Sequence, residues 1–117
     1  MGQLTTHVLD TAHGTPGAGI SLTLYRRAGD RFEALRSAIT NAEGRLDVPL
    51  LEGDAMSPGL YRLVFAAGAY FRRLGVALPD PPFVDQVVVD FGVADAAAHY
   101  HVPLLVSPYG YTTYRGS

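Results

Sequence analysis

The segment AHYHVPLLV, residues 98–106, carries two histidines, His99 and His101, two positions apart. Alternate residues of a β-strand point to opposite faces, so both imidazoles would share one face and Tyr100 and Val102 the other. Histidine exchanges a proton near neutral pH, which suits it to activate water. A histidine pair could also start a metal site, but zinc needs a third ligand and usually a fourth. The segment alone leaves open surface histidines, a metal site and a proton-transfer site, and apolar Leu105 beside the histidines favours a covered face.

Three further stretches carry residue types that could act with this pair. His7 lies in TTHVLD, Arg45 follows Glu43-Gly44 at the end of a turn, and the chain closes with YRGS, residues 114–117. Taken alone, each has an ordinary explanation: a structural histidine, a surface arginine and a loose tail. His13 lies in a turn rich in glycine and proline, where a solvated role is expected.

One chemistry would unite these residues. A neutral imidazole takes a proton from water, and a guanidinium holds a carbonyl-rich or anionic molecule through two hydrogen bonds. Hydroxyl groups of Tyr114 and Ser117 could orient the substrate or the water. The set fits addition of water to an activated carbonyl without a cofactor or a metal. Spacing in the sequence cannot bring the residues together, because they are far apart along the chain.

Composition narrows the class of protein. The 117 residues are expected to form one domain, 1–117, with 48% hydrophobic and 17% charged residues and a formal charge of −2. The basic residues are all arginine and are interleaved with acids, so no nucleic-acid partner is expected. The absence of cysteine excludes disulfides, thiol catalysis and cysteine-ligated zinc. No apolar run or leader-like segment is present, so we expect no membrane association and a cytoplasmic location.

Short runs of β-formers separated by glycine, proline, asparagine and aspartate dominate the rest of the chain. They predict an all-β fold, an antiparallel β-sandwich of about eight strands. The predicted strands are 4–10, 20–26, 31–39, 45–48, 60–66, 83–91, 98–106 and 109–114. Helical spacing of Tyr70, Phe71, Leu74 and Leu78 predicts one short helix over 68–78, ended by the prolines that begin at Pro79.

The motifs THVLDTAHGTPGAG (6–19), TNAEGR (40–45) and HYHVPLLVSPYGYTTYRGS (99–117) together resemble the 5-hydroxyisourate hydrolases. These are transthyretin-like enzymes of purine catabolism, and the resemblance covers essentially the whole chain. The terminal YRGS is its most specific part, because it separates the hydrolases from transthyretin itself. Glu43 stands where many relatives have aspartate, a change in a turn that should leave Arg45 in place.

The resemblance implies a transthyretin-like sandwich and a homotetramer with active sites between subunits. It also implies that 5-hydroxyisourate, a small-molecule substrate, is hydrolysed at a cyclic amide to 2-oxo-4-hydroxy-4-carboxy-5-ureidoimidazoline. The implied catalytic residues are His7, Arg45, His101 and Ser117. The implied substrate-binding residues are His7, Arg45, Tyr114, Arg115 and Gly116.

The sequence leaves three questions open. Which of His7 and His101 is the base is undecided, as is the role of His99. A rival from another class is a carrier of small ligands such as thyroid hormone on the same fold, since fold alone does not fix function. The two histidines and YRGS argue for the enzyme.

Overall fold

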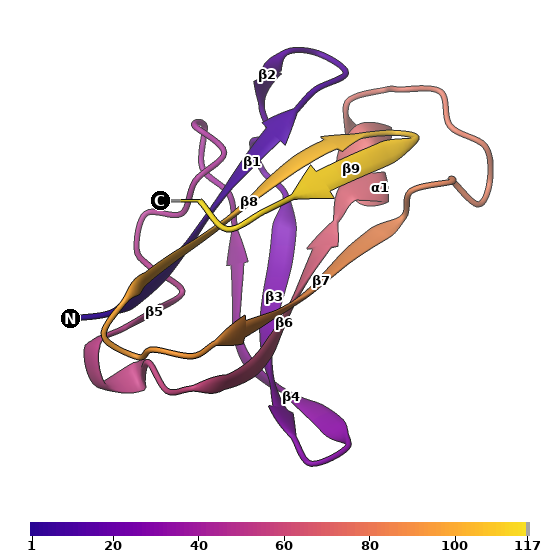
Figure 1. Ribbon diagram of the computed structural model, residues 1–117. Coiled ribbons are helices and arrows are strands. Elements are labelled where there is room, and N and C mark those ends of the chain that lie inside the picture. The colour runs from indigo at the N-terminus through magenta and orange to yellow at the C-terminus, as the bar shows by residue number, and fades with distance from the viewer. Residues whose placement is uncertain (117) are drawn as a thin grey trace.

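The chain folds into nine strands, one α-helix and one short 3₁₀ turn in a computed structural model that describes residues 1–116 (Figure 1). The strands are β1 Gln3–Asp10, β2 Thr15–Pro16, β3 Ser21–Ala28, β4 Arg31–Ile39, β5 Leu51–Glu52, β6 Gly59–Ala66, β7 Gln86–Val93, β8 His99–Ser107 and β9 Gly110–Thr113. The 3₁₀ turn is Gly53–Ala55 and the helix, α1, is Ala67–Arg73.

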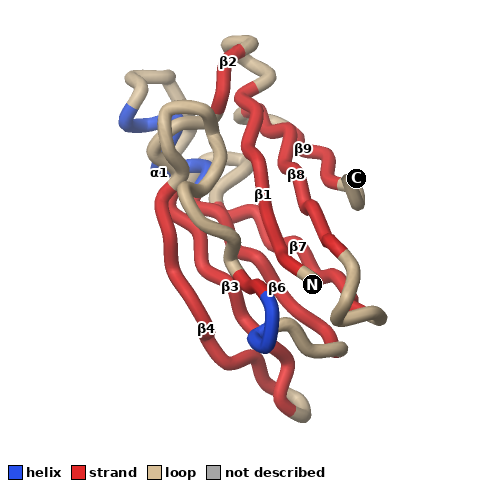
Figure 2. Tube along the Cα trace, turned by 90° about the vertical axis from the view of Figure 1, so that its left-hand side faces the viewer, coloured by secondary structure: helices blue, strands red, loops and turns tan. Residues whose placement is uncertain are grey.

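Two sheets pack face to face, as a β-sandwich requires (Figure 2). One sheet has the order β2-β1-β8-β9, with β5 also paired to β1, and the other has the order β4-β3-β6-β7. The predicted all-β sandwich with one short helix is therefore confirmed. The strand pairs are antiparallel except for β1 and β8, which run parallel with Thr5 opposite His101 and His7 opposite Pro103.

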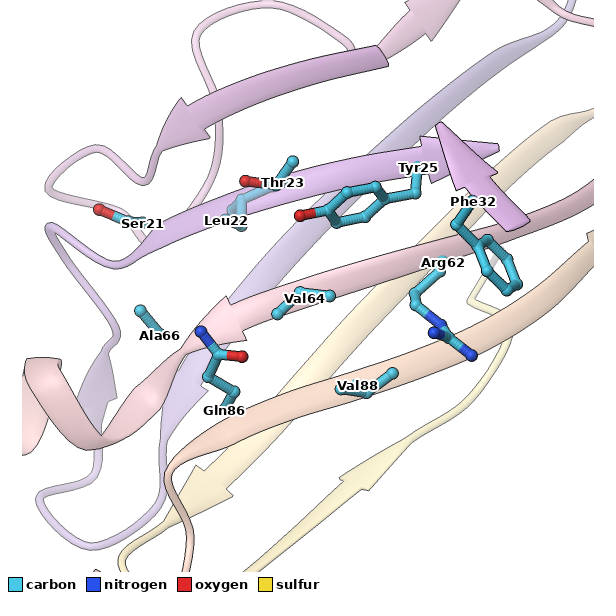
Figure 3. Close-up of a pocket in the computed structure, with 10 residues that line it drawn as sticks. All are labelled: Ser21, Leu22, Thr23, Tyr25, Phe32, Arg62, Val64, Ala66, Gln86 and Val88. Carbon is cyan, nitrogen blue, oxygen red and sulfur yellow. The ribbon is translucent and has the colours of Figure 1, made fainter. Parts of the chain in front are cut away.

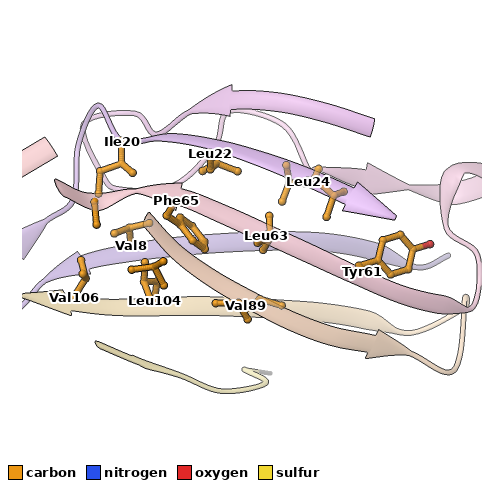
Figure 4. Packing of buried hydrophobic residues seen from close by; sticks show 14 of the residues in the cluster. Val8, Ile20, Leu22, Leu24, Tyr61, Leu63, Phe65, Val89, Leu104 and Val106 are labelled. Atoms are coloured by element: carbon orange, nitrogen blue, oxygen red, sulfur yellow. The ribbon is translucent and has the colours of Figure 1, made fainter. Parts of the chain in front are cut away.

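The core lies between the sheets and comes from alternation along the strands (Figure 4). In β8, Tyr100, Val102, Leu104 and Val106 are buried inward, as the sequence predicts, while His99 is exposed and His101 half-buried on the outer face. β1 alternates in the same way, with Val8 fully buried. The outer face of β1 and β8 is thus the surface on which chemistry could take place.

The helix is shorter than predicted because glycine, not proline, ends it. It stops at Arg73, and Gly75 adopts a positive φ of 80°. The Val76 N–H then donates to the Phe71 carbonyl at 3.1 Å, as in a Schellman ending. Buried Tyr70 and Phe71 seat the helix, and the Arg73 guanidinium donates to the Gly19 carbonyl at 2.8 Å. Within residues 1–116, no helix has the length and apolar character to cross a membrane.

Two strand predictions need correction. Residues 45–48 do not form a strand: Arg45 makes a single bridge to His7, and the chain then turns. The pairing expected there comes instead from β5, which adds to β1 at Gln3 and Leu4. The strand predicted from 83 begins at Gln86, because the preceding residues continue the proline-rich loop.

Candidate active site

Four polar side chains lie on the outer face of the five-stranded sheet. Thr5 and His7 come from β1, and His99 and His101 come from β8. The parallel register sets Gln3 beside His99 and Thr5 beside His101, so residues 96 apart in sequence become neighbours. Alternation points all four side chains away from the core.

Arg45 is held beside this face by a tightly bonded turn. The Asn41 side-chain oxygen accepts from the backbone N–H of Glu43 at 2.9 Å and of Arg45 at 3.1 Å. Gly44 has a φ of 74°, and a Cβ there would meet the Val8 carbonyl oxygen at 2.3 Å, so glycine is required. The Val8 N–H in turn donates to the Gly44 carbonyl at 2.8 Å, which fixes the turn to β1. The hydrogen bonds that fix the turn do not use the Glu43 side chain.

The Arg45 side chain is available to a ligand. Among the described residues its guanidinium has neither an ion-pair nor a hydrogen-bond partner, in contrast to Arg62, which pairs with Asp90. It lines a hollow of about 320 Å³ on the outer face. The other residues of that hollow are Thr5, Thr6, Leu46, Val48, His99 and His101. A cation and two imidazoles therefore share one concave surface.

The surroundings of His7 and His101 lower the pKa of both rings and keep them neutral near pH 7. The pKa of His101 lies below its ordinary value of 6.5, first because of partial burial, then because of the Arg45 charge and because of repulsion by His7 and His99 in their protonated forms. The pKa of His7 is lowered by burial and by Arg45, although Glu43 opposes this effect. Neutral imidazoles near pH 7 are proton acceptors, which is the state that water activation needs.

The C-terminal segment reaches this face at Gly116. The Gly116 N–H donates to the His101 carbonyl at 2.7 Å, in register with β9, although β9 itself ends at Thr113. A Cβ added to Gly116 would lie 2.7 Å from Cδ2 of His101. Only glycine leaves the His101 ring undisturbed.

Tyr114 and Arg115 line a different hollow, of about 210 Å³, which opens between β7 and β8. The Arg115 guanidinium lies 4.1 Å from the centre of the Tyr100 ring and donates to the His99 carbonyl at 3.3 Å. The structure thus brings His7, Arg45, His101 and Gly116 together and sets Tyr114 and Arg115 apart from the 320 Å³ hollow. Ser117, the remaining predicted site residue, lies outside the described range.

A larger hollow, of about 480 Å³, lies on the outer face of the four-stranded sheet (Figure 3). Arg62 is the basic side chain among its lining residues, and it is already engaged by Asp90 at 2.6 and 2.9 Å. The same guanidinium stacks on Phe32 at 4.0 Å. Its lining residues, all within 1–116, include no histidine. The lining residues of this hollow thus offer no histidine or carboxylate for proton transfer near neutral pH.

Sequence reasoning missed Thr5. Its Oγ1 lies 2.8 Å from Nε2 of His99 and 2.8 Å from Nδ1 of His101. Alternation in TTHVLD would have placed Thr5 on the face of His7, but the partner across the sheet cannot be read from sequence. The sequence left the role of His99 open, and this contact shows that His99 is linked to His101 through Thr5.

Comparison with known proteins finds similar hydrolases along the full length of the chain. A 5-hydroxyisourate hydrolase of Pseudomonas aeruginosa is 59% identical over all 117 residues of this chain and 93% of its own length. The solved 5-hydroxyisourate hydrolase of Klebsiella pneumoniae superposes with a TM-score of 0.80 at 35% identity, covering 98% of this chain and 99% of that one.

Transthyretin shares the fold at lower identity. Sea bream transthyretin in complex with thyroxine has a TM-score of 0.87 at 28% identity, covering 97% of this chain and 94% of that chain. The family profile described as HIUase/Transthyretin matches residues 4–116, nearly the entire sequence. With this match and the full-length relatives, the chain belongs to the HIUase/Transthyretin family.

Proposed function

We propose that this chain hydrolyses 5-hydroxyisourate to 2-oxo-4-hydroxy-4-carboxy-5-ureidoimidazoline, a step of urate degradation. The observation that carries the proposal is one concave face that holds His101, whose pKa is lowered, and the Arg45 guanidinium, which has no partner within residues 1–116. The hydrolase names of its full-length relatives support the same substrate. The reaction adds water across a cyclic amide, so it needs a base for the water and a donor for the developing oxyanion.

His101 and His7 supply the base. Their lowered pKa values leave both rings able to accept a proton at neutral pH. The proton taken from water can then be given to the departing ring nitrogen, so one imidazole serves as base and then as acid. His101 is the better placed of the two, because it lines the hollow that Arg45 shares.

Arg45 supplies the charge. Its guanidinium can bind the oxygen-rich edge of the substrate through two parallel hydrogen bonds. As water attacks, negative charge grows on the carbonyl oxygen, and a donor positioned there lowers the barrier by roughly 3–4 kcal/mol. The bonded turn from Asn41 to Arg45 holds the backbone in place, so only the side chain must be ordered on binding.

The C-terminal residues complete the site in this proposal. Tyr114, Arg115 and Gly116 would contact the substrate, and Ser117 would join the hydrogen-bond network. Tyr114 is 58% exposed in the single chain, which supports its engagement at a subunit contact. The expected homotetramer, with sites between subunits, is part of the same proposal. The cytoplasmic location stays a prediction.

The carrier alternative is less well supported. A carrier of thyroid-hormone type would have no use for a cation beside neutral imidazoles, and this chain is 28% identical to transthyretin against 59% to a hydrolase. Polar and charged groups left without partners in an apolar carrier site would weaken binding.

Absorbance of freshly made 5-hydroxyisourate tests the proposal. Urate oxidised by an oxidase gives the substrate, and its ultraviolet decay is followed with wild-type chain, with a His101→Asn variant and with a His13→Asn control. We expect acceleration over spontaneous decay for wild type and His13→Asn, and little for His101→Asn. Decay at the spontaneous rate with the wild-type chain would reject the proposed function.

A further inference from the structure

A single hydroxyl group joins two histidine rings on the active face. Thr5 Oγ1 lies 2.8 Å from Nε2 of exposed His99 and 2.8 Å from Nδ1 of half-buried His101. The ring centres are 6.3 Å apart and tilted by 62°, so the rings meet at Thr5 and not by stacking. Both contacts have the length of good hydrogen bonds.

Proton counting restricts this arrangement. A threonine hydroxyl has one hydrogen to donate and two lone pairs that accept. Thr5 can therefore donate to one ring only, and at least one of the two contacting nitrogens must carry a proton. Two arrangements of donors use the hydroxyl fully. Either His101 donates to Thr5 and Thr5 donates to His99, or His99 donates to Thr5 and Thr5 donates to His101.

The direction of hydrogen-bond donation through Thr5 decides whether His101 can act as a base. When Nδ1 of neutral His101 carries the proton and donates to Thr5, Nε2 is bare and can take a proton from water. When Nδ1 accepts from Thr5, the proton of neutral His101 is on Nε2 and the ring cannot act as a base.

We propose that Thr5 relays a proton between His101 and His99, and that His99 thereby holds His101 in the base-competent state. The proposal rests on the proposed hydrolase function. Thr5 and His99 are positioning residues here, because they act through His101. In the resting enzyme, Nδ1–H of His101 donates to Thr5, and the Thr5 hydroxyl donates to bare Nε2 of His99.

The relay balances its protons over one turnover. Nε2 of His101 takes a proton as the water oxygen bonds to the carbonyl carbon. The Nδ1 proton passes to Thr5 while the Thr5 hydrogen passes to Nε2 of His99, so the positive charge moves to His99. When the carbon–nitrogen bond breaks, Nε2 of His101 gives its proton to the departing nitrogen, and the chain returns to its first direction.

Surrounding charges favour this displacement of the cation. Arg45 in the 41–45 turn and His7 on β1 both lower the pKa of His101. On the other side, the Arg115 guanidinium bonds the backbone carbonyl of His99 at 3.3 Å and stacks on Tyr100, and its charge works against a cation on His99, which solvent screens. A cation on His101 is therefore opposed by positive neighbours and partial burial, whereas exposed His99 is better solvated.

Nitrogen-15 NMR of the histidine rings tests the resting state directly. Above pH 7, wild-type His101 is expected to carry its proton on Nδ1 and His99 on its own Nδ1. Thr5→Val should abolish the preference of His101, whereas Thr5→Ser should retain it. A wild-type spectrum with the proton of His101 on Nε2 would overturn the proposal, and this measurement needs neither a variant nor turnover.

Kinetics test the relay itself. Thr5→Val should lower kcat about 10- to 100-fold with little change in KM, and Thr5→Ser should stay within about twofold. His99→Gln keeps an acceptor for the Thr5 hydroxyl but no basic group, so the His101 tautomer should persist while kcat falls. Thr11→Val is the matched control, since the Thr11 hydroxyl also crosses from the β1 side to β8, donating to Val106 at 3.1 Å.

Equal kcat for Thr5→Val and Thr11→Val would reject the relay even where the wild type is active. If the wild type itself does not hydrolyse 5-hydroxyisourate, the proposed function fails, whereas the tautomers of His99 and His101 still decide whether Thr5 links them.

Discussion

His101 and His13 lie in two hydrogen-bonded groups of opposite character. His13 Nδ1 approaches Asp10 at 2.6 Å, and the Asp10 carboxylate is fully buried, where it also accepts from Tyr70 at 2.7 Å. His101 bonds a neutral hydroxyl, and its charged neighbours are positive. The same residue type is thus tied to an anion in one region and placed near the Arg45 cation in the other.

The difference separates structure from chemistry. Burial alone would raise the pKa of Asp10, but the hydrogen bonds from Tyr70 and His13 outweigh it and hold the pKa below its ordinary value. Burial and the bond to Asp10 raise the pKa of Tyr70 to about 12. The bond between Tyr70 and Asp10 joins α1 to the end of β1 and keeps Asp10 ionised and Tyr70 protonated near neutral pH, whereas His101 can exchange a proton.

The largest expected effect is on activity at the cationic face. Arg45→Ala should reduce kcat/KM about 10²- to 10³-fold through the loss of the oxyanion donor, with the thermal midpoint nearly unchanged. Steady-state kinetics and thermal unfolding on the same samples measure the two quantities. Arg36→Ala, on exposed β4, is the control and should keep full activity. Near-normal turnover by Arg45→Ala would remove Arg45 from the mechanism.

Gly116→Ala should act on His101 without reaching the Asp10 group. The added Cβ would meet Cδ2 of His101 at 2.7 Å, and displacing the ring by a fraction of an ångström should cost up to about 10²-fold in kcat. Gly110→Ala is the matched control, because nothing lies within 4 Å of a Cβ there. Equal kcat for both variants would show that the His101 ring tolerates the contact.

Tyr70→Phe should act on stability alone. It leaves the buried Asp10 carboxylate with one donor fewer, which should reduce the free energy of unfolding by about 1–3 kcal/mol. Urea unfolding measures the change, and the folded variant should keep its activity. The control is Tyr25→Phe, since the Tyr25 hydroxyl has no hydrogen-bond partner within residues 1–116. A loss of kcat in Tyr70→Phe would mean that the two regions are coupled.

The smallest effect is a displacement of the pH profile. Because the pKa of His101 is lowered, kcat/KM should fall on the acid side with a midpoint below 6.5. Asp10 has a lowered pKa in the folded chain, so its contribution to stability is present above pH 3.8 and is lost as pH falls through the folded-state value. The pH at which kcat/KM falls and the pH at which the free energy of unfolding falls should therefore differ. An activity midpoint at or above 6.5 would contradict the cationic surroundings of His101.

Helix α1 shows how local signals compete. The sequence contains both Gly75 and the prolines from Pro79, and either can end a helix. The helix ends at Gly75 because the positive φ of this glycine allows the Val76 N–H to bond back to the Phe71 carbonyl. Tyr70 and Phe71 are already buried within the two turns that precede it. Residues 45–48 fail as a strand for a related reason: the Asn41 side chain bonds the turn backbone that a ladder would need.

The sequence by itself determined the sandwich and the two faces of its strands, because alternation of side chains is a local property of the backbone. It therefore predicted that His99 and His101 share the outer face while Tyr100 and Val102 enter the core. Only the tertiary structure decided that β1 lies parallel to β8 with Thr5 beside His101, and that the Asn41–Arg45 turn faces the same hollow. Register between segments more than 90 residues apart depends on packing of the whole core, which no local pattern contains.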